Sequence, residues 1–523
     1  MTPRPARFGP PLLALLLAVP AVQAQSTAST ASSDASRGRE LAATCANCHG
    51  TGGRARGEMR PLAGMPPQAM LAMLDAYRKG TLPATIMHQI AKGYTEEQLG
   101  LVAAWFGSQP AATRCLAAAG LAGCATPPAG GAVGRVVVVG GGFGGSTAAR
   151  YLRLWDPGIA VTLVERQPRF VSCPISNLVV GGFRRLEDVT LGYDGLRAQG
   201  VEVVQGEVVA IDAAARQVRL AGGRSLPYDR LVLSPGVDFL WDAIGGLQQA
   251  VDRGEVMHAW KAGPQTLALR ARLEAMRDGG VYALSIPKSP YRCPPGPYER
   301  ACMVAAYFKQ HKPRSKVLVL DANAEVQSKK ALFEKAFREH YAGLLEYRPN
   351  SELKDVAGST ARLEFEDVRA DVLNVVPIQR AADIARSTGL VNVNQRWVGV
   401  NWQTMESQVA QGIHVLGDAT FSAPLMPKSG HMANQHAKVA AAAIVRALRG
   451  EPPPAAPVVM NTCYSFVTPR DVIHVASVHQ YDAAEKTFRT VPGSGGVSAA
   501  ATEQEGRYAL SWADNIWADM LAV

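Results

Sequence analysis

The sequence predicts a multidomain protein in which a small all-α domain precedes a larger α/β dinucleotide-binding fold. Three observations predict it. The chain has 523 residues, enough for roughly three or four domains. Residues 45–49 read Cys-Ala-Asn-Cys-His, the motif that attaches a c-type haem covalently. Residues 140–145 read Gly-Gly-Gly-Phe-Gly-Gly directly after an apolar run, as in the βαβ units that bind dinucleotides.

Composition and charge narrow the function classes. Hydrophobic residues make up 47% of the chain and charged residues 19%, as expected for a globular protein with buried cores. The formal net charge of +10 is spread along the chain without a block of Lys or Arg. We therefore expect no nucleic-acid binding.

The N-terminus has the pattern of an export signal. Arg4 and Arg7 precede an apolar run over 12–19, and a small-residue cleavage site ends at Ala24. This pattern predicts a signal peptide over 1–24, and the apolar run is too short to span a membrane as a helix. We expect a periplasmic protein without stable membrane insertion. The alternative is an uncleaved anchor.

After a flexible lead over 25–35, residues 36–109 form the predicted helical domain. A helix is expected over 37–46, leading into the haem motif. Thr95-Glu96-Glu97-Gln98 is a capping box that begins a second helix with the apolar run 99–106. Two terminal helices flanking a haem loop resemble a single-haem class I cytochrome c.

The haem motif assigns its own ligands. Cys45 and Cys48 would form the thioether bonds, and His49 would supply one axial nitrogen. The sixth ligand of electron-transfer cytochromes is usually a thioether sulfur. The methionines available for it are Met59, Met65, Met70, Met73 and Met87.

Residues 110–133 are rich in Ala, Gly and Pro and are predicted to be a linker. The segment contains Cys115 and Cys124, which could form a local disulfide. The alternative is two unrelated thiols. No His follows either cysteine, so the linker holds no second haem motif.

The dinucleotide-binding domain is expected in two parts, over 134–245 and 376–455. In the first part, a strand over 135–139, a helix to 154 and a strand over 161–164 complete the βαβ unit. In the second part, a strand over 412–419 ends in Asp418, which many FAD enzymes use on the ribityl or phosphate end. The candidate FAD-binding residues are Gly140, Gly142, Gly145, Glu165 and Asp418.

An insert over 246–375 separates the two parts and resembles a second dinucleotide domain. It contains strands such as 281–286 and 316–320. Where a nicotinamide site needs a glycine turn, the chain has Pro287-Lys288-Ser289-Pro290. NAD(P)H is therefore not the expected electron donor, and the haem is the expected exit for electrons.

Four further segments resemble the flavoprotein subunit of flavocytochrome c sulfide dehydrogenase over about 134–523. They are Cys173-Pro174-Ile175-Ser176-Asn177, residues 291–300 (Tyr-Arg-Cys-Pro-Pro-Gly-Pro-Tyr-Glu-Arg), Met426-Pro427-Lys428-Ser429-Gly430 and Asn461-Thr462-Cys463-Tyr464-Ser465. Residues 85–87 and 90–94 resemble one haem domain of that enzyme's cytochrome subunit. The two subunits are therefore predicted to be fused in one chain.

The resemblance implies a fold, an activity and several residue roles. The fold would be glutathione-reductase-like, with a C-terminal α+β domain over 456–523. The activity would be sulfide oxidation with cytochrome c as acceptor. Cys173 matches the cysteine that links covalently to FAD, Cys293 and Cys463 match the redox-active disulfide, and Met87 matches the sixth haem ligand.

Four residues have more than one possible role. Cys173 could instead be free or in a disulfide. Glu299 could be an acid or base for sulfide protons, or form a salt bridge at a helix N-terminus. Lys428 could stabilise reduced flavin, or serve a phosphate or the surface. Cys302, on a helix over 301–308, would be a buried inert thiol or pair with Cys293.

Two other functions are weighed. The first is a sulfide:quinone reductase relative, or an enzyme for another sulfur compound, with the amphipathic segment Trp512–Leu521 touching a membrane. The second is an electron carrier or redox sensor without catalysis. A three-cysteine flavin site argues against the second function.

Overall fold

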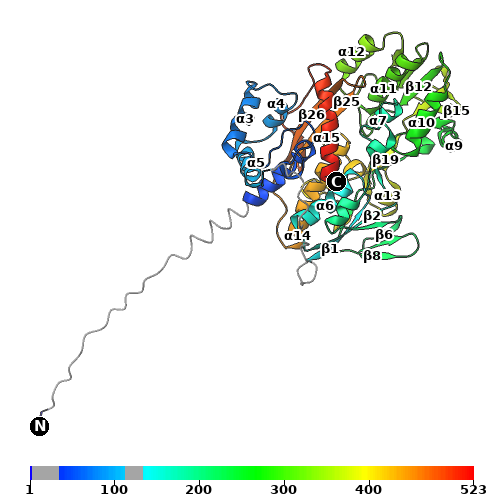
Figure 1. Ribbon diagram of the computed structural model, residues 1–523. Coiled ribbons are helices and arrows are strands. Elements are labelled where there is room, and N and C mark those ends of the chain that lie inside the picture. The colour runs from blue at the N-terminus through cyan, green and yellow to red at the C-terminus, as the bar shows by residue number, and fades with distance from the viewer. Residues whose placement is uncertain (3–33, 112–132) are drawn as a thin grey trace.

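The computed structural model describes residues 1–2, 34–111 and 133–523. The predictions for the signal peptide and for the Cys115–Cys124 pair lie outside these residues, as does most of the predicted flexible lead. Figure 1 shows a small helical lobe, in blue, beside strands β25 and β26 and helix α15 of the C-terminal region. The two larger α/β lobes lie on the other side of that region.

The N-terminal lobe is all-helical, as predicted. Residues 34–43 are helical. The later elements are α2 (Ala46–His49), η1 (Thr51–Gly53), α3 (Pro67–Lys79), α4 (Met87–Ile90), η2 (Ala91–Gly93) and α5 (Glu96–Ser108). The predicted capping box is confirmed, since the Thr95 N–H donates to Gln98 Oε1 at 2.9 Å and the Gln98 N–H donates to Thr95 Oγ1 at 3.1 Å.

The first α/β lobe is built on a seven-stranded sheet with the order β22-β23-β24-β9-β1-β2-β5. Its strands are β1 (Gly134–Val139), β2 (Ile159–Glu165), β5 (Glu202–Gln205), β9 (Arg230–Leu233), β22 (Val400–Asn401), β23 (Glu406–Ser407) and β24 (Ile413–Val415). Strand β24 pairs in parallel with β9, and β9 pairs in parallel with β1. Segments from before and after the insert therefore share one sheet. Helices α6 (Phe143–Trp155) and α14 (Gly430–Leu448) pack against each other.

The insert forms a second, five-stranded parallel sheet with the order β11-β18-β12-β13-β14. Its strands are β11 (Val256–Met257), β12 (Val281–Ile286), β13 (Lys316–Asp321), β14 (Leu345–Arg348) and β18 (Val372–Val375). Its helices are α9 (Leu247–Asp252), α10 (Pro264–Ala275), α11 (Gly296–His311) and α12 (Lys330–His340). The strands predicted over 281–286 and 316–320 are confirmed.

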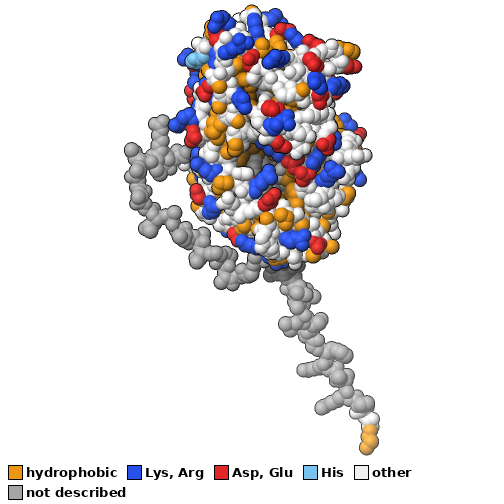
Figure 2. Space-filling view, turned by 90° about the vertical axis from the view of Figure 1, so that its right-hand side faces the viewer, with side chains coloured by type: hydrophobic (Ala, Val, Ile, Leu, Met, Phe, Trp, Pro, Cys, Tyr) orange, Lys and Arg blue, Asp and Glu red, His pale blue; other side chains and the backbone are white. Residues whose placement is uncertain are grey.

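Short elements complete both lobes. The small strands are β3 (Phe170–Val171), β4 (Thr190–Leu191), β6 (Val208–Asp212), β7 (Gln217–Leu220), β8 (Ser225–Pro227), β10 (Val237–Phe239), β15 (Asp355–Ala357), β16 (Thr360–Arg362), β17 (Asp367–Arg369), β19 (Gln379–Ala381), β20 (Val391–Val393) and β21 (Trp397–Val398). The short helices are α7 (Ser176–Val180), η3 (Leu186–Val189), α8 (Asp194–Ala198), η4 (Trp241–Ala243), α13 (Asp383–Ser387) and η5 (Gly417–Ala419). Basic and acidic side chains are interspersed over the face shown in Figure 2.

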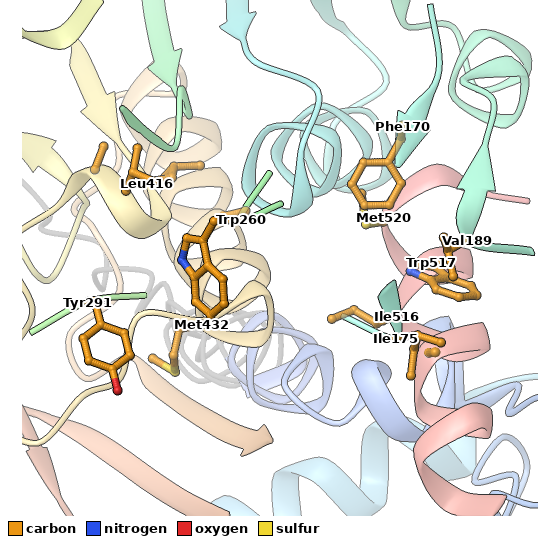
Figure 3. Packing of buried hydrophobic residues seen from close by; sticks show 14 of the residues in the cluster. Phe170, Ile175, Val189, Trp260, Tyr291, Leu416, Met432, Ile516, Trp517 and Met520 are labelled. Atoms are coloured by element: carbon orange, nitrogen blue, oxygen red, sulfur yellow. The ribbon is translucent and has the colours of Figure 1, made fainter. Parts of the chain in front are cut away.

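The C-terminal region is an antiparallel sheet followed by a long helix. The sheet contains β25 (Val458–Phe466), β26 (Val472–Asp482), β27 (Thr487–Thr490) and β28 (Gly496–Val497), and the helix is α15 (Glu503–Leu521). In Figure 3 the side chains of Ile516 and Trp517 lie toward Ile175 and Val189, within one hydrophobic cluster. This helix therefore joins the C-terminal region to the first α/β lobe.

The suggestion that the C-terminal segment touches a membrane is wrong. The apolar face of α15 is buried inside the protein through Trp512, Ile516, Trp517, Met520 and Leu521. An amphipathic pattern marks a face that leaves water, and here that face packs on the protein's own core. In the described part of the chain, no helix is long and apolar enough to cross a membrane.

The helical lobe shares a hydrophobic core with the C-terminal sheet. Ile90 and Val102 of the lobe belong to one cluster with Met460 and Val478 of the sheet. Gly93 lies so close to the sheet that an added Cβ would be 2.4 Å from Val478. The lobe is therefore packed tightly against the sheet.

A buried ion pair ties the haem-motif segment to the rest of the protein. Lys438 Nζ lies 2.8 Å from Asp519 Oδ2, and both side chains are almost fully buried. Lys438 also donates to the Ala43 carbonyl and to Asn47 Oδ1, while Asp519 accepts from Thr51 Oγ1. Residues on both sides of the Cys-Ala-Asn-Cys-His motif are thus fixed to α14 and α15.

Candidate functional site

Cys293 and Cys463 meet in the structure although they are 170 residues apart in sequence. Cys293 precedes α11 with φ 54°, and its N–H donates to the Lys428 carbonyl at 2.8 Å. Cys463 lies within β25. Both are free cysteines, and their thiols share a hydrogen bond. Their side chains are close enough to form the predicted pair.

Cys302 is placed apart from this pair. Its side chain is fully buried within α11 and is a free cysteine. Burial raises the pKa of its thiol well above the usual value. A neutral, inaccessible thiol fits the inert role, and Cys293 has Cys463 as its neighbour instead of Cys302.

The two thiols of the pair differ in acidity. The hydrogen bond from Cys293 lowers the pKa of Cys463 to about 7, against burial, and the nearby Lys329 ammonium lowers it further. The same hydrogen bond, together with burial, raises the pKa of Cys293. In the reduced pair, Cys463 therefore carries the negative charge and Cys293 keeps its proton.

A pH profile should reveal this asymmetry. In the reduced protein we expect iodoacetamide to modify Cys463 with a rate that rises with pH, has its midpoint near pH 7 and reaches a plateau above it, whereas an ordinary thiol has a higher midpoint. Below that pH the thiolate is lost and the rate falls. Peptide mass spectrometry after timed alkylation checks this, and a midpoint near the usual cysteine value would contradict the assignment.

Glu299 lies next to the pair and is buried. Its Oε1 accepts from the Phe466 N–H at 2.9 Å, and its Oε2 accepts from Asn177 Nδ2 at 2.8 Å. Burial raises the pKa of Glu299. The alternative of a salt bridge at the N-terminus of α11 is wrong, because within the described residues these amide donors, with no cation, hold the carboxylate. A carboxyl with a raised pKa is suited to hold a proton near a thiol.

Cys173 lies near the same site, before α7. Its Sγ accepts from the Ala262 N–H at 3.4 Å and lies 3.5 Å from Arg292 Nη2. Arg292 Nη1 also lies 3.8 Å from Asp418 Oδ2. One partly buried guanidinium therefore lies between two predicted site residues, Cys173 and Asp418, and directly precedes a third, Cys293, in sequence.

The glycine turn has the geometry of a dinucleotide cradle. At Gly140, with φ 96°, an added Cβ would lie 2.3 Å from the Ser234 carbonyl oxygen, and at Gly145 it would lie 1.8 Å from the Gly140 oxygen. At Gly142, which caps α6, an added Cβ would meet nothing within 4 Å. The close contacts hold the turn, and the open side leaves room for a pyrophosphate at the helix N-terminus.

Two acids border this cradle. Glu165, at the end of β2, accepts from the Gly141 N–H through Oε2 at 2.6 Å. Asp418 Oδ1 is buried and has no hydrogen-bond partner among the described residues. A buried carboxylate oxygen without a partner is costly unless a ligand supplies a donor. The described residues therefore fit FAD.

The Lys428 side chain is buried and makes several contacts within the protein. Its Nζ donates to the carbonyls of Asp418 and Thr420 and lies 3.9 Å from the centre of the Trp397 ring. Burial lowers its pKa to about 8. The surface role is wrong, since the side chain is buried and holds the loop after Asp418. Its contact with the flavin stays a prediction.

A cavity of about 360 Å³ lies in the helical lobe and is lined by Cys45, Cys48 and His49. His49 Nδ1 is 2.7 Å from the Arg60 carbonyl, which accepts its proton and leaves Nε2 as the unprotonated nitrogen. Burial lowers the pKa of His49 and keeps the ring neutral, as a metal ligand requires. The described residues therefore fit a covalently attached haem.

All five methionines predicted as candidate ligands line this cavity. Met73 Sδ accepts from Arg60 at 3.5 Å, and Met70 is held in the core at 4% exposure. Met87 begins α4, and both Met87 and Met65 are partly buried against the lobe's core. All five sulfurs line the cavity, and Met87 as ligand stays a prediction.

Strand β25 separates the cysteine pair from the cavity of the helical lobe and contributes residues to both. Thr462 and Tyr464 line the cavity of the helical lobe, while Cys463 between them meets Cys293. Successive side chains of a strand point to opposite faces, which places the thiol pair and the cavity on the two sides of one strand. The Thr462 and Tyr464 hydroxyls are buried, and neither has a hydrogen-bond partner in the part of the chain that the structure describes.

Sequence reasoning missed Lys329 and gave no role to Arg292. Lys329 lies just before α12 with φ 55°, and its Nζ donates to the Cys463 carbonyl and to Ser465 Oγ. No local pattern marks it, because its partners are more than 130 residues away. Arg292 could have been noticed, since it directly precedes Cys293 in a segment that already stood out.

The two sheets, the glycine cradle and the C-terminal region define a glutathione-reductase-like FAD/NAD(P)-binding fold with a C-terminal domain.

Three family models match the chain. Residues 134–261 match the model Pyridine nucleotide-disulphide oxidoreductase. Residues 266–377 match Sulfide dehydrogenase (flavocytochrome c) flavoprotein chain, central, and residues 455–521 match Flavocytochrome c sulphide dehydrogenase, flavin-binding. A sulfide dehydrogenase (flavocytochrome c) flavoprotein chain of Chlorobaculum thiosulfatiphilum is 67% identical over 45 residues, 9% of this chain and 94% of that one. The chain belongs to the flavocytochrome c sulfide dehydrogenase family of oxidoreductases, as a flavoprotein-type chain.

Other relatives extend the comparison. The cytochrome subunit of sulfide dehydrogenase from Chlorobaculum tepidum is 37% identical over 73 residues, 14% of this chain and 66% of that one. Mitochondrial sulfide:quinone oxidoreductases of Dictyostelium discoideum and Mus musculus are each 23% identical over 55% of this chain, which spans 66% and 65% of their lengths. The solved sulfide:quinone oxidoreductase of Aquifex aeolicus shares the fold, with a TM-score of 0.61, 20% identity, and coverage of 74% of this chain and 91% of that one.

Proposed function

We propose that the protein oxidises hydrosulfide at Cys293 and Cys463 and delivers the electrons through FAD to its own haem and then to an external cytochrome c. The meeting of these two cysteines beside the FAD cradle is the observation that carries the proposal. When bound, FAD supplies a two-electron acceptor and haem a one-electron outlet.

The chain's own residues perform the sulfur chemistry. Hydrosulfide attacks the oxidised pair at one sulfur, which forms a persulfide and frees the other sulfur as a thiolate. Glu299, with its raised pKa, holds a proton beside the pair and is the proposed general acid. Arg292 and Lys428 hold the loops that carry Cys173 and Asp418. We expect Cys173 to bind FAD covalently.

The proposal includes the helical lobe, which would be a cytochrome c domain fused to the flavoprotein part of the chain. The Cys-Ala-Asn-Cys-His motif, the lined cavity and the likeness to a cytochrome subunit support it. Attachment of a c-type haem and the pattern of the first 24 residues support a periplasmic location. Hydrosulfide is the proposed substrate, and an external cytochrome c or similar carrier is the proposed partner.

A sulfide:quinone reductase type of reaction is the second candidate, favoured by the likeness to those enzymes over 55% of the chain. Steady-state turnover with hydrosulfide separates the two functions. The proposal predicts turnover with cytochrome c as acceptor and slow turnover with a soluble quinone. Turnover with quinone and without cytochrome reduction would contradict it.

Substitution of the haem ligand tests the cytochrome part. We expect Met87→Ala to abolish the sulfur-to-iron charge-transfer band and to shift the haem potential by on the order of 0.1 V, because the axial thioether sets that potential. Met65→Ala, on the same cavity, is the matched control and should keep the band. A band that disappears only in the Met65 variant would reassign the ligand. Visible spectra and redox titration provide the measurement.

A further inference from the structure

Lys329 places a buried ammonium group behind Cys463. Its Nζ donates to the Cys463 carbonyl at 3.0 Å and to Ser465 Oγ at 2.8 Å. The residue is 6% exposed, and among the described residues its hydrogen bonds go to these two neutral oxygens. A buried cation is costly unless a negative charge compensates it.

Four acidic groups near Lys329 could supply the negative charge that balances its ammonium. Burial lowers the pKa of Lys329. The groups that oppose this shift are Cys463, Glu299, Cys293 and Glu505. Glu505 is held by the His474 ring at 2.9 Å. Burial raises the pKa of Glu299 and favours its neutral form. Of the two thiols, Cys463 is the one whose main chain the Lys329 ammonium contacts, and this ammonium lowers the pKa of Cys463.

We propose that Lys329 makes Cys463 the leaving group when hydrosulfide opens the Cys293–Cys463 disulfide, so that the incoming sulfur bonds to Cys293. The inference rests on the proposed function and adds the direction of attack. Lys329 is a positioning residue, since it contacts the Cys463 main chain and stabilises the charge that develops on the sulfur.

The step is balanced without another reactant. A lone pair of hydrosulfide forms a bond to Cys293 Sγ, and the Cys293–Cys463 bond breaks. Its electron pair leaves on Cys463 Sγ as a thiolate, and the proton stays on the terminal sulfur of the Cys293 persulfide. Exchange is faster when the departing thiol is the more acidic one, which favours departure of Cys463.

Rapid-quench trapping of the oxidised holoprotein tests the direction. The protein is mixed anaerobically with one equivalent of hydrosulfide, quenched with an alkylating agent and digested for mass spectrometry. We expect one extra sulfur on the Cys293 peptide and direct alkylation of Cys463. The extra sulfur on Cys463 would overturn the inference and leave the proposed function standing. An unopened disulfide would refute the proposed function itself.

Matched variants test Lys329. Lys329→Met keeps the length and removes the charge, Lys329→Arg keeps the charge, and Lys330→Met changes the next lysine, which is exposed and paired with Glu325. We expect the Met variant to open the disulfide roughly tenfold more slowly and to spread the extra sulfur over both cysteines. Arginine should restore the preference, and Lys330→Met should not alter it.

Wild-type opening rate and sulfur position in Lys329→Met would overturn the role of the charge. A purely structural role could slow the reaction but would leave the position of the added sulfur unchanged. If Lys329→Met fails to fold, the trapping result on the natural protein decides the direction of attack by itself, and Lys329→Gln removes the charge while keeping a donor for Ser465 Oγ.

Discussion

Replacement of Cys293 or Cys463 by serine is expected to lower sulfide-dependent turnover by about 10³-fold or more. The two thiols share a hydrogen bond beside the FAD cradle, and a serine hydroxyl can neither form the disulfide nor carry a persulfide. Because the loss is chemical, bound FAD and haem should stay at their normal content. Stopped-flow absorbance after mixing with hydrosulfide measures the loss.

Cys302→Ala is the matched control for this experiment. It removes a third thiol from the same helix region, but that thiol is fully buried and lies outside the pair. We expect turnover within a few-fold of the natural protein, with a modest loss of stability from the small cavity. Serine variants that keep full activity would show that the pair is structural, and the carrier hypothesis would then become the better account.

Disruption of the Lys438–Asp519 ion pair is expected to have the largest effect on stability. Asp519→Ala leaves the Lys438 ammonium buried without its counter-charge, which costs about 3–5 kcal/mol. It also removes the acceptor for Thr51 and Tyr151, and with Thr51 a contact to the haem-motif segment. Thermal and denaturant unfolding measure the change.

The pH dependence of this contribution has a definite sign. Burial alone would raise the pKa of Asp519, but Lys438 and Arg150 hold it below the usual value. The contribution is therefore present at neutral pH and is lost as the pH falls through the acidic range below that value. The Asp519→Ala variant should approach the natural protein in stability only at such low pH.

An exposed pair across the same interface provides the control. Arg507 and Glu58 join α15 to the helical lobe at 3.1 Å, but both side chains are about half exposed. Solvent screens such pairs, so Glu58→Ala should cost less than about 1 kcal/mol. Equal losses in the two variants would contradict the special role given to the buried pair.

Local patterns predicted much of the fold. The capping box at Thr95 and the βαβ unit around Gly140 depend on neighbouring residues, and both are present. The second segment of the first sheet could also be predicted, because the short strand Ile413–Val415 is followed two residues later by Gly417 and then Asp418. The same amphipathic rule failed for α15, since it cannot tell a membrane from the protein's own core.

The chemistry around the thiols was less accessible to the sequence. Cys293 and Cys463 were paired through a family resemblance, whereas Lys329 and the Lys438–Asp519 pair belong to no motif. Their roles arise from burial, which the fold creates by bringing distant segments together. Strand β25 likewise becomes the wall between two sites only because the helical lobe packs on one of its faces.

The most direct measurement is reduction of the protein's own haem by hydrosulfide. Purified holoprotein that contains both cofactors is mixed anaerobically with hydrosulfide, with no added carrier, and the haem α-band is followed. The account predicts rapid reduction in the natural protein and none in the Cys463→Ser variant. An α-band that does not change in the natural protein would contradict the claim that electrons enter at Cys293 and Cys463 and leave through the haem on Cys45 and Cys48.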